Sequence, residues 1–390
     1  MNPSASGWID KLGSLIKDKE TVFKSMGSLY YRLRDIGFIY GMNLETLLYF
    51  DEENAWSEDE VAKINLIVAL FHIYKIELNS NDYEAFIEKL IEFYYKLNTD
   101  EAPAYIPNNS KTKLETLIHH RVFIDDSIIT KTFTKVLTNS LLFIDVLAFK
   151  MYIINDEFPA LHAKKLENIV INLTYHTLNS KEEKSLYDKQ LVKLFESSIS
   201  YNKEEIAFDG SYRNELNIHF DKYESKYFLD LTCLAAWDDH SLEYKESEFI
   251  YGIGKDLKFD YEIITESINY VENFFEVHKE NLELLRNSNP VKQLYDNSAK
   301  LVNKLIRRNS KRLLKELSES KELLFLLAKS TNKDLSPEEK KKIRDQLLSI
   351  FKAIPSLAIF ALPGGAILLP FFIKLIPKLL PSAFDDNRIN

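Results

Sequence analysis

The stretch from Ala353 to Pro381, AIPSLAIFALPGGAILLPFFIKLIPKLLP, constrains the fold more than any other part of this chain. No side chain between Ala353 and Ile373 is charged, and about 21 helical residues at 1.5 Å each reach roughly across the hydrocarbon core of a bilayer. Prolines recur here at spacings of 8, 7, 7 and 4, which places all five within an arc of about 80° on a helical wheel. Each interior proline frees a carbonyl that needs a partner in lipid. We therefore predict a membrane segment at 353–384, kinked or broken at Pro363-Gly364-Gly365, whose proline face points at protein, water or a second copy.

The spacing of these prolines also carries a family resemblance. Residues 350–384, with LLP at 368–370 and LPSxF at 380–384, resemble without a gap the membrane segment of the LETM family, the leucine-zipper and EF-hand-containing transmembrane proteins. The motif residues are Pro355, Pro363, Gly364, Gly365, Pro370, Lys374, Pro377, Pro381, Ser382 and Phe384. Family members carry an acidic side chain where this chain has Ala366, and the ribosome-binding and EF-hand regions that follow the segment in mitochondrial members are expected to be absent here. The chain thus looks most like the bacterial LETM-related, biofilm-associated branch.

Turn-forming residues are scarce in the rest of the chain, which favours long helices. The chain has 10 Gly and 11 Pro in 390 residues, and five of the prolines lie in the terminal stretch. We predict an all-α fold, a multi-helix bundle followed by the proline-rich membrane segment. The single cysteine, Cys233, excludes an internal disulfide and a cysteine-rich zinc site, and fits a buried core residue.

The formal charge of −9 is unevenly distributed. From Arg286 to Lys352 there are 17 Lys/Arg against 8 Asp/Glu, whereas residues 1–285 carry a net charge of −19. A basic segment beside an apolar one is the positive-inside arrangement and suits anionic lipid. The first 20 residues lack a signal peptide's apolar core. We expect a body on the cytoplasmic side of a bacterial inner membrane, anchored from its C-terminal end.

Hydrophobic periodicity and turn residues divide the chain into six segments. We expect an N-terminal helical bundle at 1–98, a linker or loop at 99–111, a central helical domain at 112–287, a basic amphipathic neck at 288–352, the membrane segment at 353–384 and a tail at 385–390. The most apolar part of the central domain lies in a helix predicted at 127–155, with the run LLFIDVLAFKMYII. Asp145 and Lys150 interrupt this run, so we interpret it as a core helix, with a second membrane segment as the alternative.

Residues 229–275 are similar to the C-terminal part of TerB-like helical domains of the tellurite-resistance type. Asp239, Leu242 and Glu246 match the A-x-DG-x-L-x-x-x-E motif, but His240 stands where that family has glycine. A divalent-cation site would draw its ligands from Asp238, Asp239, Glu243 and Glu246. We favour the alternative of a capped helix start with solvated carboxylates, because the spacing fits no EF-hand loop. No other cofactor is expected.

The neck begins after Pro290 as a helix with one apolar and one cationic face. Headgroup or RNA contact and a merely solvated face are both open interpretations. Its central basic residues are Lys304, Arg307, Arg308, Lys311, Arg312 and Lys315. Ser336-Pro337-Glu338-Glu339 then predicts a helix start, with Ser336 as N-cap and Pro337 at the first position.

No sequence pattern for catalysis is present. The chain has no Walker loop, no Rossmann glycines, no H-E-x-x-H and no G-x-S-x-G, so we expect no enzyme. His119-His120 could bind metal only with distant partners, since adjacent helical residues diverge by about 100°. Two main interpretations of the function remain, and a third possibility is that the terminal segment folds back as a hairpin and the protein is wholly soluble or monotopic. The LETM resemblance implies a link to cation/proton exchange and, in the bacterial branch, to biofilm formation; one segment forms no pathway alone, so transport would need a homo-oligomer. The alternative is an adaptor without transport that brings protein, ribosome or RNA partners to the lipid membrane.

Overall fold

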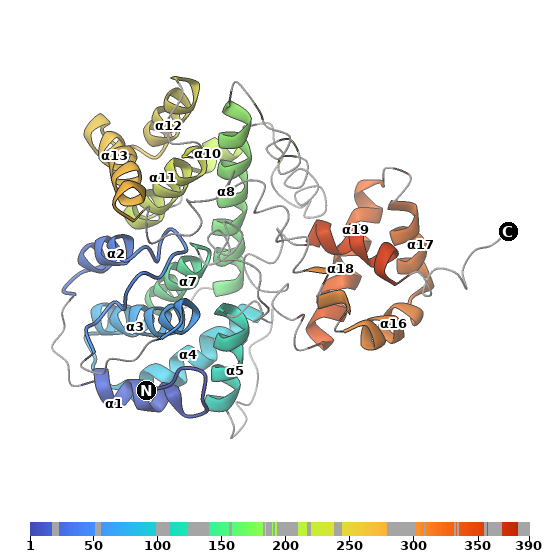
Figure 1. The fold of residues 1–390 in the computed structure, drawn as a ribbon, viewed down its shortest axis with the longest axis horizontal. Coiled ribbons are helices and arrows are strands. Elements are labelled where there is room, and N and C mark those ends of the chain that lie inside the picture. Colours follow the sequence, from blue (N-terminus) through green and yellow to red (C-terminus); the bar gives the residue numbers. More distant parts are fainter. Residues whose placement is uncertain are drawn as a thin grey trace. The chain divides into compact units, whose positions relative to one another are not determined.

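The computed structural model describes most of the chain and shows only helices in the described part. That part comprises residues 1–17, 23–50, 56–98, 110–122, 140–155, 158–181, 184, 189, 192, 210–216, 220–237, 244–278, 302–303, 305–307, 309–330, 333, 335–354, 357 and 369–380. The predicted all-α class is confirmed there. The helices are α1 (Trp8–Ile16), α2 (Met26–Asp35), α3 (Glu58–Leu78), α4 (Tyr83–Asn98), α5 (Ser110–Val122), α7 (Leu142–Asn155), α8 (Pro159–Ser180), α10 (Tyr212–Leu216), α11 (Lys222–Ala236), α12 (Tyr244–Asp256), α13 (Tyr261–His278), α16 (Ser310–Ser318), α17 (Lys321–Ser330), α18 (Pro337–Ala353) and α19 (Leu369–Leu379) (Figure 1).

The chain divides into two compact units that do not follow the order of the sequence. Unit 1 comprises residues 1–129, 135–167 and 221–227, and unit 2 comprises residues 130–134, 168–220 and 228–390. Residues 99–109 of the predicted linker lie outside the described part of the chain, and its last two residues begin α5. Helices α8 and α11 each begin in unit 1 and end in unit 2.

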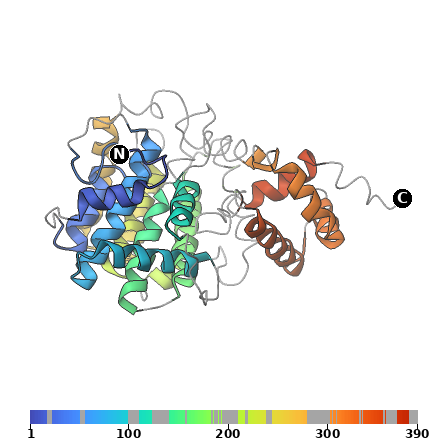
Figure 2. The same ribbon diagram turned by 90° about the horizontal axis from the view of Figure 1, so that it is seen from below.

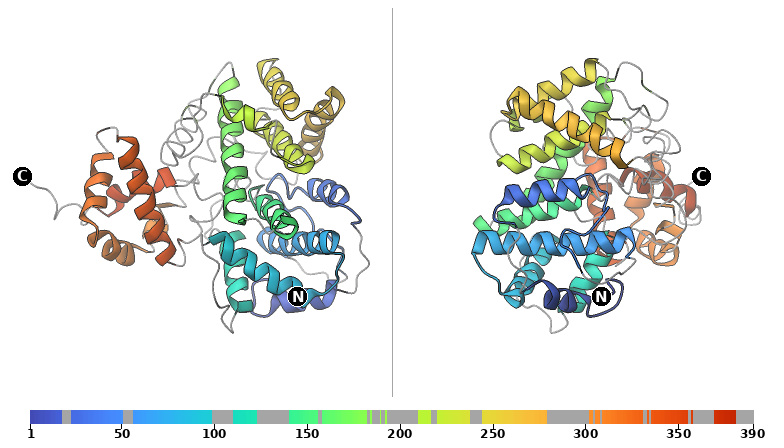
Figure 3. Two further views of the ribbon diagram at one scale, coloured as in Figure 1. Left: turned by 180° about the vertical axis from the view of Figure 1, so that it is seen from behind. Right: turned by 60° about the vertical axis from the view of Figure 1, so that its left-hand side comes forward.

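Helix α3 is the centre of unit 1 and contacts α2, α4, α5 and α7, with α7 running beside it (Figure 3). Ser57 starts the helix with a capping box, in which its hydroxyl accepts from the Glu60 amide and the Glu60 carboxylate accepts from the Ser57 amide. From Val61 to Lys75 every residue is buried, including Asn65. A helix that is buried on all sides needs partners all round, and α3 finds them in these neighbours.

Helix α7 contains the apolar run with Asp145 and Lys150, and both charges have partners inside unit 1. Arg121 donates to both carboxylate oxygens of Asp145, from Nε at 2.9 Å and from a terminal nitrogen at 2.7 Å. Lys150 forms an ion pair with Asp221. Helix α7 has 14 residues and packs on α3 and α4, which agrees with the core-helix interpretation. The predicted residues 127–139 lie outside the described part of the chain.

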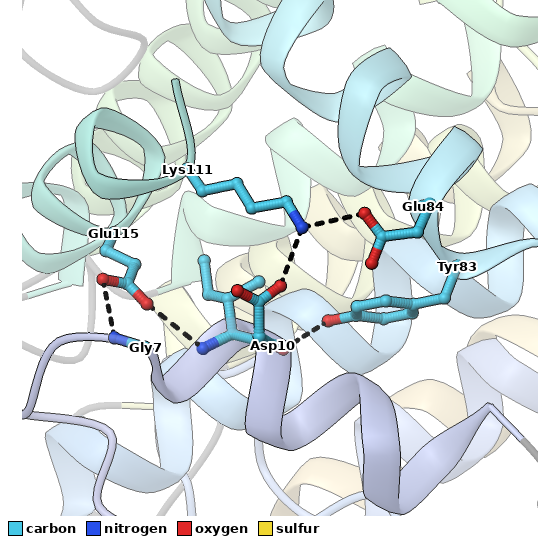
Figure 4. A network of polar contacts seen from close by, with 7 residues as sticks. Gly7, Asp10, Tyr83, Glu84, Lys111 and Glu115 are labelled. Atoms are coloured by element: carbon cyan, nitrogen blue, oxygen red, sulfur yellow. Dashed lines mark hydrogen bonds and ion pairs between the residues drawn. The ribbon is translucent and has the colours of Figure 1, made fainter. Parts of the chain in front are cut away.

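Helix α1 is held against α4 and α5 by a network of polar contacts (Figure 4). The Glu115 carboxylate accepts from the amides of Gly7 and Ile9, at 3.1 and 3.3 Å, and so satisfies free donors at the start of α1. Lys111 bridges Asp10 and Glu84 at 2.9 and 2.8 Å. The Tyr83 hydroxyl donates to the Ile9 carbonyl at 2.9 Å.

Residues 221–227, at the start of α11, complete unit 1. The Tyr227 hydroxyl donates to the Ser140 carbonyl at 2.8 Å, and its ring lies 5.1 Å from that of Phe143. Glu224 lies 2.7 Å from His162 Nε2. Residues 221–227 thus contact the segment around α7 and the start of α8 within unit 1.

In unit 2, α12 and α13 form a close helix pair. Gly254 faces Ile264 so tightly that a Cβ at this position would lie 2.5 Å from the Ile264 side chain. The rings of Trp237 and Phe275 stack at 4.1 Å, which ties the end of α11 to α13. Only a residue without a side chain permits this approach of α12 to α13.

Candidate functional site

The C-terminal helices α16, α17, α18 and α19 pack on one another and carry the predicted basic neck (orange to red in Figure 2). The predicted helix start at Ser336 is confirmed. Its hydroxyl accepts from the Glu339 amide, the Glu339 carboxylate accepts from the Ser336 amide, and Pro337 is the first helical residue. The sequence therefore defines the beginning of α18 through local hydrogen bonds alone.

Helices α17 and α18 form an antiparallel hairpin with side-chain links along it. Lys342 contacts Glu322 at 2.6 Å and Lys329 contacts Glu339 at 2.5 Å. The Ser320 hydroxyl donates to Gln346 at 2.9 Å. Such surface pairs add little stability each, but together they fix which faces of the two helices meet.

An apolar core lies between these helices and leaves the basic side chains outside. In α16, Leu313 and Leu317 are fully buried four residues apart, whereas Lys311, Arg312 and Lys315 are exposed. This is the two-faced helix expected for the neck. The core side chains are Leu313, Leu317, Leu323, Leu324, Leu327, Ile343, Leu347, Phe351, Ile354, Leu357, Phe372 and Ile376.

Helix α19 makes up most of the described part of the predicted membrane segment, and its apolar side packs against α17 and α18. Phe372 and Ile376 have no exposed surface, and the Phe372 ring lies 4.7 Å from that of Phe351. Pro370 is buried at its start, Pro377 lies inside it, and Lys374 is exposed. The motif residues Pro355, Pro363, Gly364, Gly365, Pro381, Ser382 and Phe384 lie outside the described part of the chain.

None of the described helices has both the length and the apolarity that a bilayer crossing requires. Helix α19 has 11 residues.

The predicted basic residues in the described part of the neck are all exposed. Lys311, Arg312 and Lys315 form no ion pair with any carboxylate that the structure describes, and Arg307 donates to the Asn303 side chain at 2.8 Å. Lys304 and Arg308 lie outside the described residues. Across α16–α19 the exposed cations are Arg307, Lys311, Arg312, Lys315, Lys321, Lys333, Lys341, Lys342, Lys352, Lys374 and Lys378, and the exposed carboxylates are Glu319, Glu322, Glu338 and Asp345. We call Arg307, Lys311, Arg312, Lys315 and Lys321 the cationic surface.

Of the candidate cation ligands, the structure describes Glu246 alone. This residue lies in the first turn of α12 and is buried, with 4% of its surface exposed, so it is not one of the solvated carboxylates expected there. Asp238, Asp239 and Glu243 lie outside the described residues. Within the part that the structure describes, no three His, Cys, Asp or Glu side chains gather as a metal site would require.

His119 and Cys233 were the other candidates for metal binding or catalysis, and both lie among groups that do not favour such a role. His119 Nδ1 lies 2.9 Å from the ammonium of the buried Lys63, and a cation in this place opposes metal binding at that nitrogen. Cys233 is buried, as predicted.

Sequence reasoning missed one exposed side chain among these helices. Phe325 in α17 is 66% exposed although its neighbours Leu324 and Leu326 are buried. Its place in the run KELLFLLAKS is a signal, because Phe325 falls opposite the leucine face at helical spacing.

The comparison with protein families gives one match, which covers part of this site. Residues 335–390 match the family described as "LETM1-like, RBD", the ribosome-binding domain of LETM1-like proteins, and they include α18 and α19. The LETM1-like relationship is therefore supported for this segment. The expected absence of a ribosome-binding region was wrong, since the match covers the end of the predicted neck, the predicted membrane segment and the tail. The TerB-like and biofilm-associated resemblances stay predictions. No curated protein and no solved structure matches the chain.

Proposed function

We propose that the chain is a non-enzymatic adaptor that binds the ribosome through the cationic surface of its C-terminal helices. The observation that carries this proposal is the row Lys311, Arg312 and Lys315, which is exposed on α16 without a carboxylate partner in the described residues. These residues belong to the helix group that contains the match to a ribosome-binding domain.

The physical basis is the phosphate backbone of ribosomal RNA. Cations that contact phosphates release condensed counterions, and this release supplies most of the sequence-independent affinity for nucleic acid. Residues 1–285, with a net charge of −19, repel RNA, so the charge distribution directs the C-terminal helices toward it.

Co-sedimentation of the full chain with purified ribosomes tests the proposal. Changing Lys311, Arg312 and Lys315 together to Gln should abolish the ribosome-bound fraction at 150 mM salt. The matched control changes three exposed lysines of unit 1, Lys11, Lys24 and Lys113, to Gln and alters the net charge equally. Equal binding by the two triple variants would refute the assignment.

Membrane attachment at the cytoplasmic side of the inner membrane is the second candidate function. It is favoured by the charge-free run from Ala353 to Ile373 and by the proline arc. A chain with both properties would hold ribosomes at a membrane. Vesicle flotation after an alkaline carbonate wash tests the attachment, and full release of the protein would contradict a spanning anchor.

Cation/proton exchange and a role in biofilm formation stay predictions of the family resemblance. The acidic carrier expected in the membrane segment is replaced by Ala366, and transport would need several copies around a shared pathway. Proton-driven K⁺ or Ca²⁺ flux into liposomes would support exchange, and flux equal to that of empty vesicles would end it.

A further inference from the structure

Phe325 is exposed in a helix whose other large apolar side chains are buried. In α17, Leu323, Leu324, Leu326 and Leu327 pack into the core, while 66% of the Phe325 surface faces outward. Exposing a phenyl ring of this size gives up the stabilisation that its burial would provide. The helix therefore holds an aromatic ring on its surface rather than within the fold.

The charged neighbours of Phe325 on α17 are Lys321, Lys329 and Glu322, and the Glu322 carboxylate is paired with Lys342. Residues four positions apart lie on the same helix face, so Lys321 and Lys329 flank the ring along α17. Lys329 is paired with Glu339, whereas Lys321 is exposed and has no carboxylate partner among the residues described. Lys321 belongs to the cationic surface and is the first residue of α17, which two residues separate from the end of α16.

An apolar protein-binding patch would need further exposed apolar side chains beside the ring. The other large exposed apolar residues that the structure describes lie on other elements, none of them in α16–α19; they are Tyr31, Tyr49, Leu78, Ile154, Phe158, Leu161, Tyr244, Tyr261 and Val277. One aromatic ring beside cations is instead the pattern of single-stranded nucleic-acid binding, in which rings stack on bases and cations follow the backbone.

We infer that Phe325 stacks on an unpaired base of RNA while Lys321 contacts a neighbouring phosphate. This inference rests on the proposed ribosome binding, and it specifies which part of the RNA each of the two side chains contacts. The surface would then select single-stranded loops, because the bases of a duplex are stacked on one another and their faces are not accessible.

The test measures the affinity of the full chain for a fluorescein-labelled 12-nucleotide single-stranded RNA and for a 12-base-pair RNA duplex. Phe325→Ala and Phe325→Leu should each weaken single-strand binding by about 5- to 100-fold, the range found for loss of one base–aromatic stack. Phe325→Trp should keep the single-strand affinity of the wild type. The affinity for the duplex should stay the same in all three Phe325 variants. Because the side chain is exposed, thermal unfolding should match that of the wild type.

The outcomes separate this inference from the proposed function. If ribosome binding depends on Lys311, Arg312 and Lys315 but Phe325→Leu binds single strands as the wild type does, stacking is wrong and the proposed function stands. If the wild type binds no ribosomes, both are wrong. If the Phe325 variants lose binding to vesicles of anionic lipid and keep RNA binding, the ring serves a membrane surface and the inference is overturned.

Discussion

Arg121 and Asp145 form a two-pronged ion pair in the core of unit 1, where the exposed fractions of their side chains are 4% and 0%. The Tyr94 hydroxyl donates to the same carboxylate at 3.0 Å. Burial, together with the negative charge of Asp145, raises the pKa of Tyr94 well above its ordinary value, so this hydroxyl stays a donor. The two charged groups are therefore stabilised by contacts within the protein and not by solvent.

Removing one charge of this pair should destabilise unit 1 strongly. Asp145→Asn removes the carboxylate that pairs with the buried Arg121 guanidinium, and we expect a loss of about 3–5 kcal/mol in the free energy of unfolding. Urea unfolding followed by circular dichroism measures it. The double variant Arg121→Met/Asp145→Leu should recover most of the loss. A single variant as stable as the wild type would show that the pair is not closed in solution.

Acid should weaken the fold through His72. Burial, aided by the charge of Lys75, lowers the pKa of this imidazole to about 4. As the pH falls from about 6.5 to 4, the unfolded chain takes up a proton at this ring and the folded chain does not, so stability falls with pH. The loss at this residue should approach about 3 kcal/mol below pH 4.

The measurement compares urea unfolding at pH 7.5 and pH 4.5 for the wild type and for His72→Phe. Phenylalanine keeps a ring beside Phe23, whose centroid lies 5.0 Å from that of His72. The variant should lose less stability between the two pH values, by roughly 2–3 kcal/mol. Equal losses would mean that His72 ionises in the folded chain as it does in water.

A methyl group at Gly13 should push α1 away from α4. A Cβ at this position would lie 2.1 Å from the Tyr83 ring, which is held by its bond to the Ile9 carbonyl. Overpacking of this kind costs about 1–3 kcal/mol, so Gly13→Ala should lower the thermal midpoint. The double variant Gly13→Ala/Tyr83→Leu should recover part of the lost thermal stability. Gly27→Ala is a useful comparison, because there the contact is with the end of the Tyr223 side chain.

The salt dependence of RNA binding should report the number of phosphate contacts. Each phosphate contact on a single strand contributes about −0.7 to the slope of log affinity against log salt concentration. Lys311→Gln/Arg312→Gln/Lys315→Gln should therefore flatten the slope by about 2, whereas Phe325→Leu should leave it unchanged. Fluorescence anisotropy from 50 to 300 mM salt gives both slopes. A flat wild-type slope would contradict phosphate binding by the cationic surface.

Loss of the Phe372 ring should loosen the C-terminal helices if α19 stays packed on them. This ring is fully buried against Phe351, and Phe372→Ala should cost about 3–5 kcal/mol. Hydrogen exchange of the α17 and α18 amides should accelerate in this variant and stay unchanged in Lys374→Ala, whose side chain is exposed. Equal exchange in both variants would mean that α19 is not packed there.

The parts of this fold that depend on local sequence could be predicted, and the parts that depend on distant partners could not. The Ser336 cap, the two-faced neck and the burial of Cys233 follow from spacing or residue type. The partner of Asp145 is 24 residues away, and no periodicity points to Arg121. Without that partner, the charges of Asp145 and Lys150 favour a protein core for this apolar run, but a membrane segment stays the alternative.

The same ambiguity explains the terminal segment. Apolarity predicts that a side chain avoids water, but it does not say whether lipid or protein covers it. Phe372 and Ile376 are covered by α17 and α18, and only the tertiary structure reveals this. Phe325 was missed for the opposite reason, since its exposure depends on which face of α17 the other helices cover.

The return of residues 221–227 to unit 1 has a consequence for how this protein is made. Translation delivers the N-terminal helices first, but Tyr227, which contacts Ser140 and Phe143 in unit 1, is synthesised only after residues 168–220, which are assigned to unit 2. During translation, unit 1 therefore lacks these contacts until residues 221–227 have been synthesised. A ribosome that stalls between positions 168 and 220 would leave Ser140 and Phe143 without their contacts to Tyr227.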